Sequence, residues 1–326
     1  MAAPHLDEFQ RIARFFAPLA APQALGLLDD VALIDGPPGE QYVLKTDAIV
    51  EGVHFLPDDP PAQVAQKLLR VNLSDLAAKG ATPFGYLLTT ALPAARDEAW
   101  LEAFAAGLAA DQKTYGIGLL GGDSVATPGP VTLSVAAIGR IAAGRAVLRR
   151  GARAGDRIYV SGTLGDAALG VIAAKGGDLG IGPAERDFLI DRFRLPQPRV
   201  ALGPRLVGVA AAMMDISDGL VADLGHICSV SGVAGVVEAD RLPLSPAARA
   251  ALGRDPGRLA LVLGGGDDYE LLFTAPAAAE AQLLTLARET GVPVTAIGRI
   301  EPGQGVRVID KDGREIAVKV AGYEHF

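Results

Sequence analysis

The sequence predicts an α/β protein of two domains. Its 326 residues are about twice the length of a typical domain, and short apolar runs typical of strands alternate with longer amphipathic runs typical of helices. The alternation is irregular, which argues against one regular barrel. A segment with four arginines and three glycines separates the two halves. We therefore predict an N-terminal domain over residues 1–140, a connector over 141–156 and a C-terminal domain over 157–326.

The N-terminal half contains helix and strand signals in mixed order. Phe9, Ile12 and Phe16 recur at helical spacing, and a later helix has proline near its start and glycine after its end. A GPPGE turn separates the first two strands. The predicted elements are helix 7–16, strands 31–34 and 41–44, helices 61–80 and 97–116, and strands 117–120 and 131–139.

The C-terminal half opens with a strand and continues through a glycine-rich segment at 162–177. Neither half contains an internal repeat or a low-complexity tract. The remaining predicted strands are 157–160, 213–216, 233–238, 259–263, 294–300 and 306–309. The remaining predicted helices lie around 185–212, over 218–230 and over 276–290.

Composition excludes several classes of protein. The net charge of −8 argues against a nucleic-acid partner, which normally requires a basic face. Cys228 is the only cysteine, so intramolecular disulfides and cysteine-cluster metal sites are excluded. The sequence shows no secretory leader and no run of about 18 apolar residues that could span a bilayer. We expect a cytoplasmic protein without a membrane partner.

Acidic residues recur at predicted strand ends or beside glycine. One aspartate in such a place is usually a turn former or a helix cap, but a recurring set favours a shared site. If the acids converge, two carboxylates about 5 Å apart repel by roughly 3 kcal/mol at an effective dielectric of 20, and bound cations would offset that repulsion. The acids are Asp29–Asp30, Asp47, Asp123, Asp215, Asp218, Asp267–Asp268 and Glu270.

Asp75 is an aspartate in a predicted helix. At 100° per residue it falls on the apolar stripe of Val64, Leu68 and Val71, where a carboxylate needs a partner. Oxygen ligands without histidine or cysteine clusters suit Mg²⁺, and magnesium among carboxylates and glycine loops commonly serves phosphate groups. The residues therefore predict an enzyme that acts on a nucleotide or polyphosphate with several Mg²⁺ ions.

The stretch LKTDAIVEGVHF, residues 44–55, places polar side chains directly after an apolar strand. Thr46, Asp47 and His54 are the candidates for a site there, and we favour a structural role for Glu51. The sequence contains no P-loop motif. A GxGxxG pattern at 116–121 leads into a strand instead of leaving one, so we interpret it as chance.

Nine motifs follow one another along the whole chain: LLDDVAL, KTDAIVEGVHF, VNLSDLAAKGATP, LLGGDS, LRRGARAGD, VSGTLGD, MDISDGL, GGDDYELLF and GYEHF. In this order and spacing they resemble the thiamine-monophosphate kinase family, in the superfamily of aminoimidazole ribonucleotide synthetase, selenide water dikinase and HypE. The resemblance implies a two-domain PurM-like fold of α/β (α+β) class. It also implies a homodimer in which the N-terminal ATP- and magnesium-binding domains join their sheets.

The implied reaction is ATP-dependent phosphorylation of thiamine monophosphate to thiamine diphosphate, by direct in-line transfer with several Mg²⁺ ions. The acceptor phosphate is already a nucleophile, so no residue is expected to act as a general base. The resemblance implies magnesium ligands at Asp30, Thr46, Asp47, Asp75, Asp123, Asp215 and Asp218. It implies ATP contacts at Tyr115, Gly122, Asp123, Arg149 and Ser217, and thiamine-substrate contacts at His54, Glu270 and Tyr323.

Three residues depart from the family pattern. Lys45 stands where a hydroxyl residue often precedes the Thr-Asp pair, Leu28 replaces a glycine before the first acidic motif, and Lys79 replaces an apolar residue. Lys45 leaves two interpretations open: one metal ligand is missing, or its ammonium replaces one cation.

Two alternative functions are considered. The first is another ATP-dependent enzyme of the superfamily, but the reactive cysteine or selenocysteine of the dikinase and the C-terminal cysteine of HypE are absent from this sequence. The second is a nucleotide-binding scaffold without catalysis, for which Lys45 and Leu28 are the only support.

Overall fold

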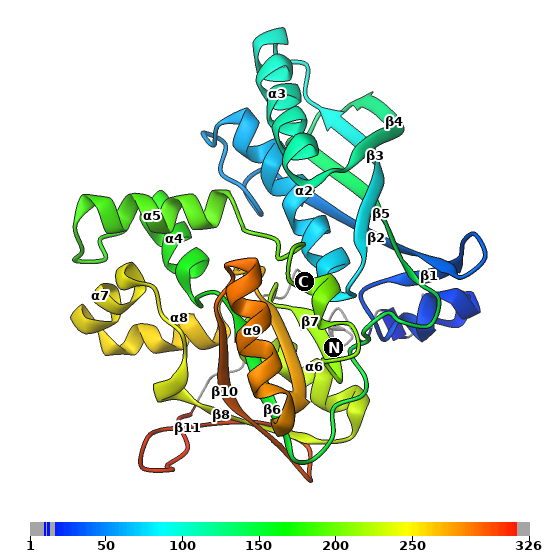
Figure 1. The fold of residues 1–326 in the computed structure, drawn as a ribbon. Helices are drawn as coiled ribbons and strands as arrows, with labels where there is room; N and C mark the ends of the chain where they lie inside the picture. The colour runs from blue at the N-terminus through cyan, green and yellow to red at the C-terminus, as the bar shows by residue number, and fades with distance from the viewer. Residues whose placement is uncertain (1–9, 11, 14–16, 318–326) are drawn as a thin grey trace, which may run out of the picture.

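The N-terminal sheet has five strands in the described part of the chain, in the order β1-β2-β5-β3-β4 (Figure 1). The computed structural model describes residue 10, residues 12–13 and residues 17–317. Neighbouring strands are antiparallel except β3 and β4, which are parallel. The strands are β1 (Ala32–Asp35), β2 (Glu40–Val50), β3 (Thr82–Leu92), β4 (Gly118–Ala126) and β5 (Thr132–Ala142).

Two long helices belong to this domain: α2 (Pro61–Ala78) lies against the sheet, and α3 (Glu98–Tyr115) packs on α2 (Figure 1). The helix α2 ends before Gly80, whose φ of +74° favours glycine. The helix α3 begins after Asp97, whose side chain accepts a backbone hydrogen bond in the first turn, and ends at the left-handed Gly116. These caps explain why both helices match the sequence prediction closely.

The C-terminal sheet has six strands among the described residues, in the order β11-β8-β10-β6-β9-β7. All neighbours are antiparallel except β11 and β8. The strands are β6 (Asp156–Ser161), β7 (Ala212–Asp215), β8 (Ala234–Glu238), β9 (Leu271–Pro276), β10 (Val294–Glu301) and β11 (Gly305–Ile309).

Helices cover both faces of the C-terminal sheet. On β6, Ile158 and Val160 belong to the same core as α6, whereas Tyr159 belongs to the core of α9, because successive strand residues point to opposite faces. A separate apolar cluster joins α4, α5 and α7. The helices are α4 (Asp166–Ala174), α5 (Pro183–Arg194), α6 (Leu220–Ser231), α7 (Pro246–Arg254), α8 (Leu259–Gly264) and α9 (Glu280–Thr290).

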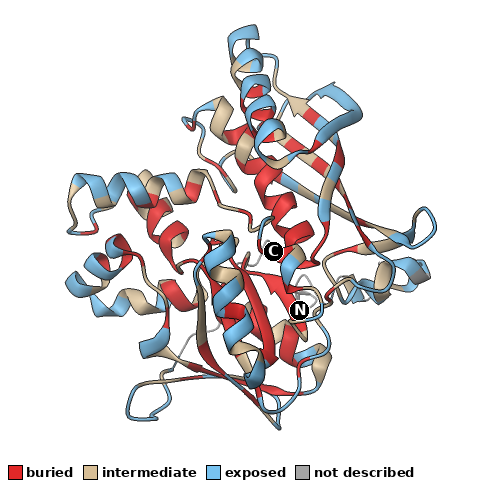
Figure 2. Ribbon diagram, viewed as in Figure 1, coloured by how far each residue is buried: buried red, intermediate tan, exposed pale blue. Residues whose placement is uncertain are grey.

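Helix α2 belongs to both domains. Its Leu68, Leu73 and Leu76 lie in the core of the N-terminal sheet, while Ala77 and Ala78 lie in the core that contains β9 and α9 of the C-terminal domain. Figure 2 shows the helix buried along nearly its whole length. The C-terminal part of α2 therefore packs against both domains.

The structure corrects the sequence prediction in several places. Strand β2 continues to Val50 because it pairs with β5 along its full length, so Thr46 and Asp47 lie inside a strand and not at its end. Residues 259–263 form helix α8 instead of a strand; a five-residue apolar run does not distinguish the two. Strands β3 and β9 and helices α4 and α7 were not predicted, and most of predicted helix 7–16 lies outside the described residues. The helix predicted around 185–212 ends at Arg194, and only a short 3-10 helix follows at Gly203–Leu206.

No helix among the described residues combines the length and the apolar character needed to cross a membrane.

Gly107 of α3 allows the close approach of α3 to α2. A Cβ atom at this position would lie 2.2 Å from the carbonyl oxygen of Ala62, so we expect Gly107→Ala to lower the free energy of unfolding by about 1–3 kcal/mol through overpacking. Urea denaturation measures the change. The matched control is Gly225→Ala in α6, where nothing lies within 4 Å of the added carbon, and we expect that variant to gain about 0.5–1 kcal/mol. Equal effects of the two substitutions would contradict the packing argument.

Candidate active site

Four segments bring acidic side chains together near the C-terminal end of α2. We call Asp29, Asp30, Asp47, Asp75 and Asp215 the carboxylate cluster; they come from the segment before β1, from β2, from α2 and from the end of β7. Their charges act on one another, since those of Asp30, Asp47 and Asp215 each raise the pKa of Asp75. The sequence prediction that the acids converge is correct for this set.

Lys45 lies between two of these carboxylates. Its Nζ is 3.3 Å from Asp47 Oδ1 and 3.1 Å from Asp75 Oδ2, because residues 45 and 47 share the face of β2 that meets α2. Burial raises the pKa of Asp75 well above its ordinary value of 3.8, although Lys45 opposes the shift. Burial also disfavours the ammonium, but Asp75 and Asp47 outweigh it and raise the pKa of Lys45. Asp75, on the apolar stripe, therefore has the partner that its position requires.

Asp30 is held by two cations of the chain itself. Arg149 donates from Nε to Asp30 Oδ2 at 2.9 Å and from its terminal nitrogen to Oδ1, and Lys79 Nζ lies 3.0 Å from Oδ2. Burial alone would raise the pKa of Asp30, but Lys79 and Arg149 hold it well below the ordinary 3.8. Lys79 also contacts Asp29 Oδ1 at 2.9 Å. The chain thus supplies the charge that stabilises this pair.

Asp215 has a buried side chain, and its Oδ2 has no hydrogen-bond partner among the described residues. Burial raises the pKa of Asp215 to about 6, with the charge of Asp30 as a second cause. A buried carboxylate oxygen without a donor fits a position for a bound cation.

Asp223 holds the loop that follows β7. One carboxylate oxygen, Oδ2, accepts hydrogen bonds from the backbone N–H groups of Ser217, Asp218 and Gly219 at 3.1, 3.1 and 3.2 Å. These bonds fix Ser217, a predicted ATP contact, and Asp218, a predicted metal ligand. The sequence analysis did not single out Asp223. The signal that could have identified it is an aspartate in the first turn of a predicted helix, four residues after Gly219.

Thr46 points away from the cluster. It alternates with Lys45 and Asp47 along β2, is exposed, and donates from Oγ1 to the carbonyl of Val135 at 3.0 Å. Its hydroxyl therefore does not join the carboxylates within one chain.

Gly122 and Asp123 lie on β4, the edge strand of the N-terminal sheet, where every residue is exposed. A Cβ atom at Gly122 would come 1.8 Å from the carbonyl oxygen of Leu88 on β3, so glycine is required by the local strand packing. Three strands in order separate β4 from β1. The structure does not bring Asp123 to the carboxylate cluster of its own chain.

His54 lies in the turn after β2, beside the C-terminal domain. Its Nδ1 accepts a hydrogen bond from the backbone N–H of Val50 at 3.0 Å, and its carbonyl accepts one from Lys67 Nζ at 2.9 Å. The same ammonium lies 2.8 Å from Asp267 Oδ2. Lys67 therefore joins the segment of His54 to the GGDDYELLF motif.

Glu270 is fully buried and is surrounded by donors. Arg192 donates to Oε1 at 2.9 Å, Arg199 donates from Nε to Oε2 at 2.6 Å and from its terminal nitrogen to Oε1, and Ser161 Oγ donates to Oε2 at 2.6 Å. Tyr115 lies near this group, since the charge of Arg199 acts on its hydroxyl. Burial raises the pKa of Tyr115, and the charges of Arg70 and Arg199 oppose that shift. The sequence analysis missed Arg192 and Arg199, which lie far from the recognised motifs.

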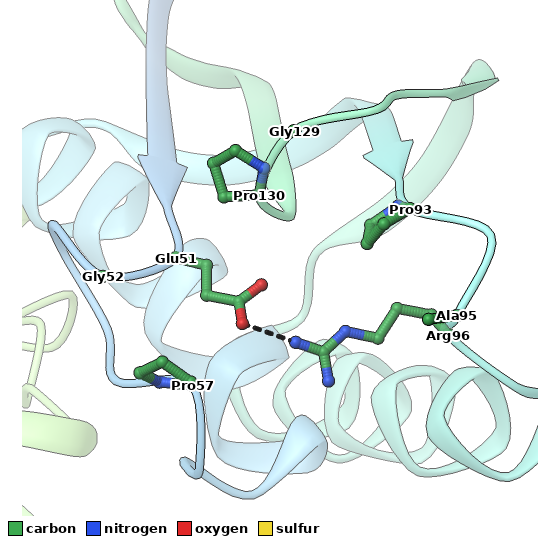
Figure 3. A pocket seen from close by; sticks show the side chains of 8 residues that line it. All are labelled: Glu51, Gly52, Pro57, Pro93, Ala95, Arg96, Gly129 and Pro130. Carbon is green, nitrogen blue, oxygen red and sulfur yellow. Dashed lines mark hydrogen bonds and ion pairs between the residues drawn. The ribbon is translucent and has the colours of Figure 1, made fainter.

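Glu51 has a structural environment. Its Oε1 accepts from Arg96 at 2.7 Å and its Oε2 accepts from the backbone N–H of Val131 at 3.1 Å. Figure 3 shows this ion pair in a pocket whose lining includes Pro57, Pro93 and Pro130. Both oxygens have partners within the N-terminal domain, as expected for a residue that joins the ends of β2 and β5.

Among the described residues, no group of three or more histidine, cysteine, aspartate or glutamate side chains is arranged so that it could hold a metal ion by itself, and this includes the carboxylate cluster. Lys45 and Lys79 each lie between two acids that would otherwise face each other. The unused oxygen of Asp215 and the partly exposed Asp47 fit magnesium, whereas Asp30 has both oxygens occupied. Predicted substrate contact Tyr323 lies outside the described residues.

Comparison with known proteins first defines the class. Residues 28–141 match the family "AIR synthase related protein, N-terminal domain" and residues 153–311 match "AIR synthase related protein, C-terminal domain". The chain is thus an AIR synthase related protein, in agreement with the predicted two-domain PurM-like fold.

Relatives define the family within that class. The thiamine-monophosphate kinase of Caulobacter vibrioides is 43% identical over 99% of this chain and 92% of its own length. The crystal structure of thiamine-monophosphate kinase from Stenotrophomonas maltophilia K279a is 45% identical, with a TM-score of 0.79 over 88% of this chain and 90% of that chain. The structure "AaThiL complexed with AMPPCP and TMP" is 32% identical, with a TM-score of 0.86 over 100% and 99% of the two chains. The chain belongs to the thiamine-monophosphate kinase family.

Proposed function

We propose that the protein phosphorylates thiamine monophosphate to thiamine diphosphate with ATP as the phosphoryl donor. The observation that carries the proposal is the full-length similarity to a structure complexed with AMPPCP and TMP, because AMPPCP is an ATP analogue whose β,γ bridge resists cleavage. In the reaction, an oxygen of the acceptor phosphate attacks the γ-phosphorus, the bond to the β,γ-bridging oxygen breaks, and ADP leaves. The electron pair of the broken bond stays on ADP, so no additional reactant is required.

The side chains of the carboxylate cluster and of the loop after β7 suit this reaction, because phosphoryl transfer requires positioning and charge neutralisation. An acceptor phosphate is anionic near neutral pH and needs no general base. Magnesium, when bound, would neutralise the phosphates; Asp47, Asp75, Asp215 and Asp218 would hold it. Arg149, in the segment between β5 and β6, and Ser217, in the loop after β7, would contact ATP.

The thiamine moiety would bind near His54 and Glu270, on the side of α2 where Lys67 joins the two segments. Because Arg192 and Arg199 compensate the charge of Glu270, a hydrogen bond to the substrate fits Glu270 better than an ion pair with the cationic thiazolium. The family resemblance also implies a substrate contact at Tyr323, which lies outside the described residues. In domain terms, residues 1–140 would supply Asp47, Asp75 and the dimer contacts, residues 141–156 would form the connector, and residues 157–326 would supply Asp215, Asp218 and Glu270.

The first test is product formation by purified protein with ATP and Mg²⁺. We expect thiamine diphosphate, separated by chromatography, from thiamine monophosphate, and none from unphosphorylated thiamine, because the acceptor must bring its own phosphate nucleophile. ATP binding in calorimetry without product from either acceptor would contradict the proposal and favour the non-catalytic nucleotide-binding scaffold.

Asp75→Asn tests the central carboxylate of the cluster. The substitution keeps shape and removes charge, so we expect a folded protein whose turnover falls on the order of 100-fold, as when a transition-state electrostatic contact is lost. Turnover at saturating Mg²⁺ is measured beside the thermal unfolding midpoint. Asp59→Asn, whose carboxylate pairs with Arg194 away from the cluster, is the control. Unchanged turnover of the Asp75 variant would refute its role.

We further propose that the protein is a homodimer that joins its N-terminal sheets through β4. This strand is an unpaired edge, and apolar side chains on it and on β3 are strongly exposed: Leu87, Leu119, Leu120 and Val125. An exposed apolar edge strand of this length normally pairs or is covered. Asp123 lies on the same edge and would therefore lie at the interface.

Leu119→Glu tests that interface. Leu119 is 50% exposed, and a carboxylate there would be buried without a partner in the dimer, so we expect the variant to be monomeric by analytical ultracentrifugation at micromolar concentration. Leu284→Glu on α9, where the leucine is similarly exposed at 52%, is the matched control and should stay dimeric. A monomeric unmodified protein, or equal dissociation of both variants, would overturn the proposed interface.

A further inference from the structure

Lys79 is the most enclosed cation of the described site. It follows the last residue of α2 and its side chain has no solvent exposure. Its Nζ lies 2.9 Å from Asp29 Oδ1 and 3.0 Å from Asp30 Oδ2, and donates to the carbonyl oxygen of Met213 on β7 at 3.2 Å. An ammonium has three N–H donors, so all three have an oxygen partner here.

The two acids beside Lys79 have no oxygen left without a donor. Asp29 Oδ1 also accepts from the backbone N–H of Asp30 at 2.8 Å, and Asp29 Oδ2 accepts from the backbone N–H of Arg149 at 2.9 Å. Both oxygens of Asp30 accept from the guanidinium of Arg149. Asp29 Oδ1 and Asp30 Oδ2 each have two partners, and a metal ion at the other two oxygens would lie beside the positive charges of Lys79 and Arg149, which would repel it.

Charge balance points the same way. Asp29 and Asp30 carry −2 together, and Lys79 and Arg149 carry +2, so the group is neutral as it stands. A divalent ion added there would leave an uncompensated charge in a buried place, which is strongly unfavourable. Asp47, Asp75, Asp215 and Asp218 carry a formal charge of −4 and Lys45 carries +1, so a net negative charge remains there for divalent ions to offset.

Lys45 differs from Lys79 in accessibility. Its side chain is 16% exposed and its partner Asp47 is 36% exposed, so incoming metal can displace this ammonium toward solvent. Lys79 has no such path, because its side chain is enclosed between α2 and β7.

We propose that Lys79 is a built-in cation that replaces a divalent metal ion at Asp29–Asp30, so that metal binds only at the remaining carboxylates. The inference rests on the proposed magnesium-dependent function. It changes the role of Asp30 from the implied metal ligand to an anchor for Lys79 and Arg149. The metal ions of the site are then held by Asp47, Asp75, Asp215 and Asp218.

Counting bound Mn²⁺ tests the proposal without turnover. Free Mn²⁺ is quantified by electron paramagnetic resonance during titration of the full chain, and the number of ions per chain is compared between variants. We expect Asp30→Asn to bind as many ions as the unmodified protein, and Asp215→Asn to lose one. Loss of an ion from the Asp30 variant would overturn the proposal, and this arm leaves Lys79 in place.

Removing the ammonium gives the converse result. We expect Lys79→Met to bind one additional Mn²⁺ ion, because Asp29 and Asp30 then lack half of their compensating charge, and to show a larger rise of the thermal unfolding midpoint with Mn²⁺ than the unmodified protein. Lys175→Met, at an exposed lysine after α4, is the control and should match the unmodified protein in both readouts. An unchanged ion count in the Lys79 variant would overturn the proposal; if that variant does not fold even with Mn²⁺, the Asp30 arm decides.

The proposed reaction and the proposed role of Lys79 can be refuted independently of each other. Thiamine diphosphate formation by a protein whose Asp30 variant loses an ion would retain the proposed function and refute the role of Lys79. Mn²⁺ counts as expected, without thiamine diphosphate, would retain the role of Lys79 and refute the reaction.

Discussion

The structure depends on one constraint: helix α2 is buried between two domains and yet carries charged residues. Lys67, Asp75 and Lys79 are nearly inaccessible to solvent, and a buried charge without a partner costs several kcal/mol. Their partners come from β2, from the segment before β1, from β7 and from the loop after α8. The helix therefore connects the two sheets through these ion pairs and hydrogen bonds.

The charged residues along α2 fall into two regions. Toward its C-terminal end, acids predominate and the two lysines offset them only in part. Toward Lys67, the carboxylate of Glu270 is paired with Arg192 and Arg199, and the buried carboxylates of Asp166 and Asp268 also interact with this group. A polyphosphate with its metal ions fits the first region, and an organic moiety that is recognised by hydrogen bonds fits the second. The two regions lie at different positions along one helix.

Local sequence signals predicted the long helices and the convergence of the acids, because proline, an N-cap aspartate and C-terminal glycines fix α2 and α3, and because Asp75 on an apolar stripe demands a partner. Other features depended on tertiary pairing. The extension of β2 to Val50 follows from its register with β5, and the apolar run at 259–263 becomes a helix once Val262 and Leu263 pack below α6. Arg192 and Arg199 reach Glu270 from distant positions that no spacing rule connects.

Lysines and metal ions play different parts in such a cluster. The ammonium of a lysine at the end of a helix is part of the chain. It therefore neutralises carboxylates without the entropy cost of binding a free ion, and it remains in place when the nucleotide leaves. It cannot follow a phosphate or coordinate several oxygens at once, as magnesium does. A fixed cation is therefore best suited to Asp29 and Asp30, which anchor Arg149, whereas exchangeable ions are needed where phosphate oxygens arrive. The distribution of exposure agrees with that division: the acids around Lys79 are enclosed, and Asp47 opens to solvent.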